Sequence, residues 1–125
     1  NKVERWNLIA EESAKQSKRD YVPIVNNPIS FDEMVDLLEG ENNIIVPYEM
    51  EDSYGLQKAL GKATLGKINI IIGPEGGFEE EEICKLRNIK GQVVTLGPRI
   101  LRTETAGLVV SSIVLYELGD LGVIR

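Results

Sequence analysis

Apolar and polar positions along the chain follow helical and strand spacing in turn. In the first half, apolar residues at helical spacing predict an amphipathic helix near the N-terminus. Ser30 followed by Glu33 fits a capping box that begins a second helix, and Gly40 is a plausible end for it. The elements predicted here are a helix over about residues 1–16, a strand at 21–25, a helix between Ser30 and Gly40, a strand at 43–47 and a short helix within 53–65.

The second half gives a clearer pattern. Its predicted elements are a buried strand at 68–72, a helix at 79–88 with Ile83 and Leu86 facing inward, a strand at 92–96, and a long apolar-faced helix that ends at Gly119. Strands that alternate with helices are typical of an α/β fold with a mostly parallel sheet flanked by helices. Since no repeat or change of composition divides the sequence, we expect one domain over residues 1–125.

The amino-acid composition limits the class of protein and the kinds of functional site. A chain of 125 residues with 42% apolar and 27% charged residues is typical of a globular domain. No apolar run is long enough to cross a bilayer, so we expect no membrane partner. The sequence has no histidine, which excludes histidine-based zinc sites and triads, so we expect no metal. It has one cysteine, which cannot form an internal disulfide, so we expect a cytoplasmic location. Cys84 itself is predicted to be a small core residue.

Two loops carry the candidate chemistry. We call residues 73–78 the first bend and residues 97–106 the second bend; each follows a predicted strand. In open α/β sheets ligands bind beyond the carboxyl ends of strands, and glycines let backbone approach a ligand closely. Either bend alone has a second interpretation as an ordinary tight turn. Two such bends after consecutive strands favour a ligand pocket.

The charge beside the first bend indicates what the pocket accepts. Four glutamates at residues 79–82 fill the first turn of the helix after this bend. They would repel a phosphate at the helix N-terminus, and no Walker A ending is present, which disfavours an enzyme that binds nucleotide phosphates. A solvated first turn that suits the helix dipole is the alternative interpretation of the four glutamates. Under both interpretations a neutral or cationic ligand, such as a sulfonium nucleoside, is favoured.

Two longer motifs give a specific resemblance. They are IIIGPEGGF at residues 70–78 and LGPRILRTETA at residues 96–106, with shorter matches at 5–6, 14–17, 22–23, 46–49 and 119–122. With these motifs the chain resembles, over essentially its whole length, the 16S rRNA (uracil-N3) methyltransferase family RsmE of the SPOUT superfamily. The resemblance implies S-adenosylmethionine as cofactor, a C-terminal trefoil knot, a homodimer, and 16S rRNA or the small ribosomal subunit as partner.

Part of the family pattern is missing from this sequence. The N-terminal RNA-binding barrel and the opening strand–helix–strand part of the methyltransferase domain have no counterpart here. The net charge of −6, from 14 basic and 20 acidic residues, also gives the chain no general attraction for RNA. The alternative function is therefore a catalytically inactive fragment that binds S-adenosylmethionine and dimerises.

The resemblance also assigns roles to individual residues. The donor is expected to lie among backbone groups of three segments. The residues concerned are Val46, Pro47, Gly73, Glu75, Gly76, Gly77, Leu96, Gly97, Leu101, Thr103, Thr105 and Ala106. Thr103 has a second interpretation as the cap of the last helix, and Glu75 as a side chain that hydrogen-bonds loop amides.

Catalysis at uracil N3 needs stabilisation of charge on the flanking carbonyl oxygens. Arg102 is the candidate for this role, and Glu104 is the candidate to take the proton or to orient Arg102. A structural ion pair between these two side chains is the alternative. Arg99, Lys15 and Arg19 are the candidate RNA-binding residues. Arg99 has a second interpretation as a support for its loop, and the other two as part of a solvated helix face.

Overall fold

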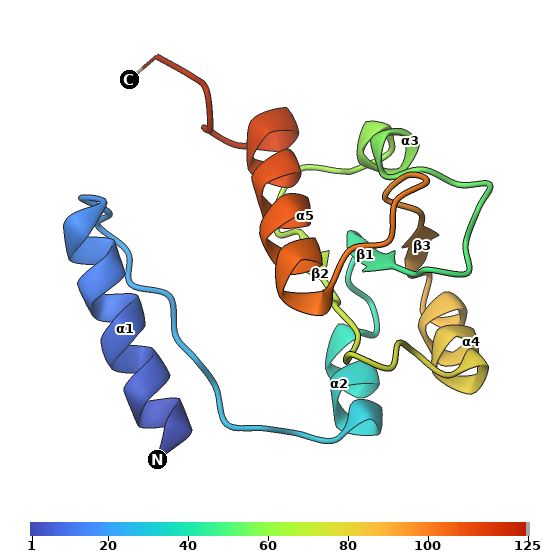
Figure 1. Cartoon of the computed structure of the whole chain (residues 1–125), viewed down its shortest axis with the longest axis horizontal. Helices are drawn as coiled ribbons and strands as arrows, with labels where there is room; N and C mark the ends of the chain where they lie inside the picture. Colours follow the sequence, from blue (N-terminus) through green and yellow to red (C-terminus); the bar gives the residue numbers. More distant parts are fainter. Residues whose placement is uncertain (125) are drawn as a thin grey trace. The chain divides into compact units, whose positions relative to one another are not determined.

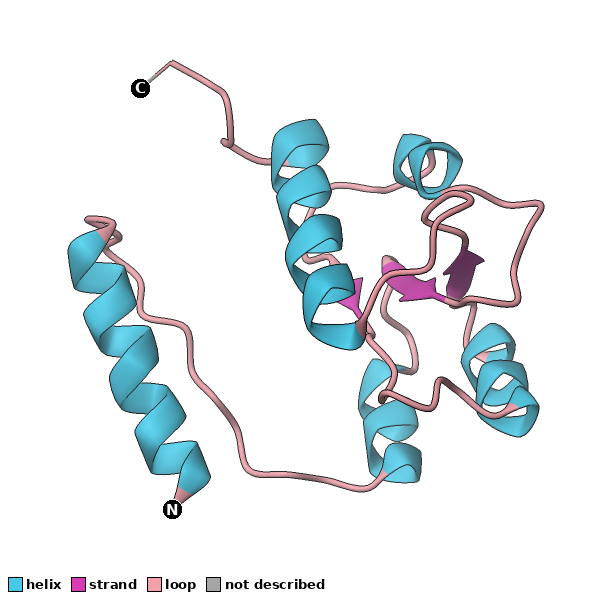
Figure 2. Cartoon of the chain, in the orientation of Figure 1, coloured by secondary structure: helices cyan, strands magenta, loops and turns pink. Residues whose placement is uncertain are grey.

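The computed structural model describes residues 1–124, and the chain divides into two compact units, residues 1–34 and the residues that follow. Figure 1 follows the chain by sequence and Figure 2 by secondary structure. The elements of the described chain are α1 (Lys2–Gln16), α2 (Phe31–Leu38), β1 (Ile44–Pro47), α3 (Leu56–Gly61), β2 (Asn69–Ile70), α4 (Glu80–Asn88), β3 (Gln92–Val94) and α5 (Thr103–Leu118). Among these helices none is long and apolar enough to cross a membrane. The single domain over the whole chain stays a prediction.

The first unit contains α1, an extended segment held to it by one amide side chain, and the first residues of α2. Asn1 caps α1 by accepting a hydrogen bond from the Glu4 backbone N–H, which confirms the predicted first helix. The strand predicted at residues 21–25 is wrong, because no strand forms there. Instead, the Val25 N–H donates to Asn7 Oδ1 at 2.7 Å, and Asn7 Nδ2 donates to the Val25 carbonyl at 2.9 Å. The Asn7 amide thus satisfies the backbone groups that a neighbouring strand would otherwise pair.

The predicted boundaries of α2 are confirmed by their contacts. The Glu33 N–H donates to Ser30 Oγ at 3.1 Å, and the Ser30 N–H donates to the Glu33 carboxylate at 3.4 Å. These reciprocal bonds form the capping box that the sequence indicated. Gly40, just after the helix, has a φ of 88°, a left-handed conformation that glycine adopts without strain.

The sheet is parallel and three-stranded, with the order β2-β1-β3. β1 lies at its centre, where Ile44, Ile45 and Val46 are buried. Ile45 is opposite Ile70 of β2 and Gln92 of β3. This arrangement confirms the predicted α/β fold with a parallel sheet and flanking helices. The buried strand predicted at 68–72 is shorter and only half-buried, since β2 pairs on one side alone within the described sheet.

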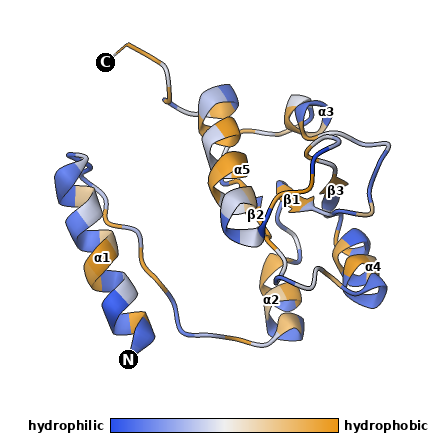
Figure 3. Cartoon of the chain, viewed as in Figure 1, coloured by the Kyte–Doolittle hydropathy of each residue, from blue (hydrophilic) through white to orange (hydrophobic). Residues whose placement is uncertain are grey.

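The core packs α3 and α5 against the sheet. Its buried members are Ile45, Leu56, Ala59, Leu60, Val94, Val110 and Val114. Figure 3 shows hydrophobic residues on several turns of α5, but only part of that helix is buried. Leu108, Ile113 and Tyr116 of α5 are exposed.

In helix α4 the apolar spacing predicted the buried residues correctly, with one exception. Its Ile83 and Leu86 are buried, as the helical spacing predicts. Cys84, between them in sequence, is exposed, so its prediction as a core residue is wrong. The step of one residue from Ile83 rotates Cys84 by about 100° around the helix, away from the buried side.

Candidate ligand-binding cleft

The two bends meet at one edge of the sheet. Because β1, β2 and β3 run parallel, the segments after their carboxyl ends emerge on the same side. They enclose a cleft of about 1350 Å³. Its walls are residues 47–52 after β1, residues 72–78 with the first bend, and residues 95–104 with Ala106 from the second bend. The predicted convergence of the two bends on one pocket is therefore observed.

The first bend is a tight turn with an aromatic side chain folded over it. The Gly77 N–H donates to the Pro74 carbonyl at 2.8 Å, and Gly77 has a φ of 79°. A Cβ atom at Gly73 would lie 3.0 Å from the Phe78 ring. Glycine at 77 therefore relieves backbone strain, while glycine at 73 lets the Phe78 ring approach the backbone.

The second bend is held by a threonine at the end of the strand. The Gly97 N–H donates to Thr95 Oγ1 at 3.1 Å, and Gly97 has a φ of 111°. The last residues of the bend form the start of α5, which begins at Thr103. The interpretation of Thr103 as the helix cap is wrong. Arg102 occupies that position with an extended backbone and without a side-chain capping bond.

Most of the residues predicted to bind the donor line this cleft. They are Pro47, Gly73, Glu75, Gly76, Gly77, Leu96, Gly97, Leu101, Thr103 and Ala106. Val46 is fully buried in the centre of the sheet, and Thr105 lies on an exposed part of α5; neither contributes to the lining. Thr105 is directed away because it follows Thr103 by two residues, about 200° around the helix.

The charge of the lining is negative. Over residues 1–124 it includes five carboxylates and two guanidinium groups, a formal difference of −3. These residues are Glu49, Glu51, Asp52, Glu75, Glu104, Arg99 and Arg102. Such a lining favours a cationic ligand over a phosphate-bearing one. Within residues 1–124, no group of three or more His, Cys, Asp or Glu side chains is arranged to hold a metal ion.

Two structural alternatives for the charged residues are not observed. Arg102 and Glu104 are both exposed and form no ion pair with each other in the described chain. Glu75 is also exposed, and within residues 1–124 its carboxylate accepts no hydrogen bond from a loop amide. The charged groups of these side chains are therefore available to a ligand in the cleft.

The three candidate RNA-binding residues are not equivalent. Arg99 lines the cleft and is exposed. Lys15 and Arg19 belong to the first unit, residues 1–34, and are exposed there. Lys15 Nζ lies 3.5 Å from the Glu11 carboxylate, on its own helix, and 4.0 Å from that of Glu12. This local pairing reduces the positive charge that Lys15 presents to a partner.

Glu51 is a cleft residue that the sequence did not single out. Its carboxylate accepts hydrogen bonds from the Ser53 N–H, the Ser53 hydroxyl and the Tyr54 N–H, at 3.0, 2.9 and 2.8 Å. Arg87 Nη2 of α4 donates to its other oxygen at 3.2 Å. The bonds from Ser53, first its backbone N–H and then its hydroxyl, hold the pKa of Glu51 below its ordinary value; Tyr54 and Arg87 act in the same direction, and burial opposes them.

This pKa shift makes stability depend on acidity. Because the pKa of Glu51 is lower in the folded than in the unfolded chain, its contribution is present in full above the ordinary value of 4.5. This contribution to stability is lost as the pH falls through the lower pKa that Glu51 has in the folded chain. When the pH is lowered from 7 to 3.5, the free energy of unfolding, measured with urea, should therefore fall less for Glu51→Gln than for the unchanged protein. Equal losses in the two proteins would contradict the assigned role of Glu51.

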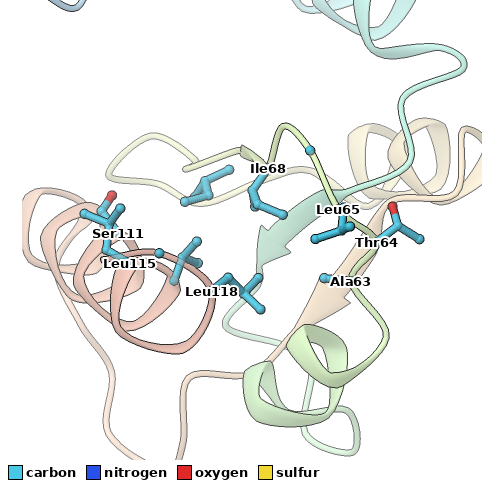
Figure 4. Close-up of a pocket in the computed structure, with 11 residues that line it drawn as sticks. Ala63, Thr64, Leu65, Ile68, Ser111, Leu115 and Leu118 are labelled. Atoms are coloured by element: carbon cyan, nitrogen blue, oxygen red, sulfur yellow. The ribbon is translucent and has the colours of Figure 1, made fainter. Parts of the chain in front are cut away.

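A second cavity lies on another part of the molecule. It measures about 500 Å³ and lies between α5 and the segment that leads into β2 (Figure 4). Among the described residues, its lining includes Leu65, Ile68, Leu115 and Leu118 but no charged side chain. Binding sites for small polar molecules need a few placed polar groups to orient the ligand. The cleft between the bends meets this requirement better than the apolar cavity does.

Comparisons with known proteins agree with the resemblance found in the sequence. A model of the RNA methyltransferase domain matches residues 1–115. Ribosomal RNA small subunit methyltransferase E of Bacillus subtilis is 39% identical over 121 residues, which cover 93% of this chain and 47% of that protein. The chain spans about half the length of the curated relatives that it matches.

Solved structures give the same result. The Ribosomal RNA small subunit methyltransferase E of Neisseria gonorrhoeae, crystallised bound to S-adenosyl methionine, is 34% identical with a TM-score of 0.81; the match covers 96% of this chain and 48% of that one. A putative methyltransferase from Legionella pneumophila, in complex with the bound cofactor SAM, is 28% identical with a TM-score of 0.78 over 92% of this chain and 46% of that one. The predicted relation to RsmE is thereby confirmed. The chain belongs to the RNA methyltransferase domain family.

Proposed function

We propose that this chain is the donor-binding part of an RsmE-type methyltransferase that uses S-adenosylmethionine to methylate N3 of a uridine in 16S rRNA. One observation carries the proposal: two glycine-containing bends converge on a cleft whose lining has an excess of carboxylates. The relatives whose structures contain the donor support it, since their folds match nearly all of this chain.

The lining suits this donor chemically. Backbone groups of the bends can bind the edge of an adenine, and their glycines leave room for it. The cleft volume exceeds the 300–1,000 Å³ usual for small-molecule sites, so it has space for an adenosine and for part of a substrate base. Bound there, the donor would supply an electrophilic methyl group carried on a positively charged sulfur. The carboxylates of the lining favour that charge.

The proposed catalytic residues act on the substrate base. Before N3 can accept the methyl group it must lose its imide proton, which places negative charge on the two flanking carbonyl oxygens. The guanidinium of Arg102, exposed at the cleft, is always charged and can donate two hydrogen bonds to such oxygens. Glu104, also in the lining, is proposed to accept the proton, since the chain has no histidine. Arg99 is proposed to contact an RNA phosphate.

The remaining expectations are part of the same proposal. They are a SPOUT-type knot, a homodimer, 16S rRNA or the small ribosomal subunit as partner, RNA contacts by Lys15 and Arg19, and a cytoplasmic location. The exposed apolar residues of α5, Leu108, Ile113 and Tyr116, support the dimer, because a second copy would remove them from water.

Ligand preference tests the proposed donor site. Because three phosphates would meet the negative lining, calorimetry should show that the protein binds S-adenosylmethionine at least about tenfold more tightly than ATP. S-adenosylhomocysteine, which lacks the sulfonium charge, serves as the control for recognition of the adenosine. Tighter binding of ATP would contradict the proposal and favour an enzyme that acts on nucleotide phosphates.

Methyl incorporation tests the reaction itself. The purified protein is incubated with labelled donor and unmodified small ribosomal subunits, and the modified base is identified by mass spectrometry. We expect 3-methyluridine in 16S rRNA. Saturable donor binding without any incorporation would instead support the alternative, a donor-binding and dimerisation fragment. Label on another base or another atom would contradict the assignment to uracil N3.

A further inference from the structure

One carboxylate, that of Glu51, is hydrogen-bonded both within the loop after β1 and to α4. Glu51 lies in the loop after β1, and only 12% of its side chain is exposed. One of its oxygens accepts three hydrogen bonds from Ser53 and Tyr54 within that loop. Its other oxygen accepts from Arg87, which is 36 residues away on α4. The pair therefore joins the loop after β1 to the last turn of α4, the helix that follows the first bend.

The same loop is bonded to the third wall. The Thr95 N–H donates to the Tyr54 carbonyl at 2.8 Å, and the Leu56 N–H donates to the Thr95 carbonyl at 3.2 Å. Thr95 Oγ1 in turn accepts from the Gly97 N–H at 3.1 Å. A continuous series of bonds therefore runs from Arg87 through Glu51, Tyr54 and Thr95 to the second bend.

We propose that Glu51 and Arg87 are positioning residues that hold the loop after β1 and the second bend in the shape that binds the donor. The inference rests on the proposed function. Neither residue is needed to touch the donor for this role. A preorganised site binds more tightly because the ligand does not have to order it.

The ion pair between Glu51 and Arg87 contributes little to the free energy of unfolding of the whole chain. Arg87 is half-exposed, and exposed ion pairs contribute about 0–1 kcal/mol. Glu51 is held by the loop amides even without Arg87, so losing the arginine frees the loop from α4 without unfolding it. This difference separates a positioning role from a merely structural one.

Variants of Arg87 test the inference. Arg87→Gln removes the charge and the contact with Glu51, whereas Arg87→Lys keeps the charge. We expect calorimetry to show donor binding weakened about tenfold in Arg87→Gln and about threefold or less in Arg87→Lys. Both variants should melt within a few degrees of the unchanged protein. Glu51→Gln should weaken donor binding at least as much as Arg87→Gln.

A matched control uses an ion pair outside the cleft. Glu41 lies 3.8 Å from Lys67 and accepts a hydrogen bond from Asn69, but it does not line the cleft. Glu41→Gln should leave donor affinity unchanged. Unchanged affinity in Arg87→Gln and Glu51→Gln, with the unchanged protein binding the donor, would overturn the inference alone. Absence of donor binding by the unchanged protein would overturn the proposed function instead.

Discussion

Replacing Arg102 with alanine is expected to reduce methyl transfer at least about a hundredfold, the usual loss when one donor to a developing negative charge is removed. The affinity for S-adenosylmethionine should stay within about threefold, because the guanidinium is assigned to the uracil oxygens and not to the donor. The fold should be unaffected, since Arg102 forms no side-chain capping bond at the start of α5. Single-turnover transfer assays and calorimetry on the same preparation measure both quantities.

Two further variants separate this role from a general effect of positive charge. Arg102→Lys keeps the charge but loses the planar pair of donors, so we expect it to recover only a small part of the rate. Arg99→Ala removes the other guanidinium of the cleft and should raise KM for RNA more than it lowers kcat. Full transfer by Arg102→Ala would refute the assigned role. Equal losses in kcat for Arg99→Ala and Arg102→Ala would also contradict it.

Replacing Gly97 with alanine is expected to weaken donor binding at least about thirtyfold, equivalent to about 2 kcal/mol. Gly97 has a φ of 111°, which alanine rarely adopts, so the second bend must shift to accommodate the side chain. Gly97 also lines the cleft, where a Cβ atom would occupy open space, with no described residue other than its chain neighbours within 4 Å. Calorimetric titration with S-adenosylmethionine measures the loss.

Gly66 provides a matched control for this substitution. Its φ is 116°, and a Cβ atom there also meets nothing within 4 Å, but Gly66 lies outside the cleft between the bends. Gly66→Ala and Gly97→Ala should therefore each lower the free energy of unfolding by about 1–3 kcal/mol, whereas only Gly97→Ala should weaken donor binding. Similar affinities for the two variants would show that the second bend does not form the donor site.

Hydrophobic spacing predicted where the helices lie, and it was most informative where one side of a helix is buried. In α4, for example, Ile83 and Leu86 are both buried as expected. The strand expected at residues 21–25 does not form, since Asn7, 18 residues away from Val25, satisfies its backbone groups. Short apolar runs do not reveal such a partner. The length of β2 was also overestimated, because pairing with β1 fixes its ends and a run of isoleucines does not.

The cleft was predictable because its two bends follow parallel strands, whose ends meet by geometry. The glycines at positions 77 and 97 indicated tight bends, and both have positive φ angles in the structure. The role of Glu51 was not predictable, since it depends on Arg87 of a helix that approaches only in the folded chain. Thr103 was wrongly predicted to be the cap because threonine is often found there, whereas the helix already begins at Thr103 and its cap is Arg102.

Co-crystallisation with S-adenosylhomocysteine shows whether the two bends hold the donor. We expect electron density for the adenosine between residues 73–78 and residues 97–106, with the sulfur on the side of the lining that carries Arg102. Density for the adenosine elsewhere on the protein, with this cleft closed by its own side chains, would show that the two bends do not form the donor site.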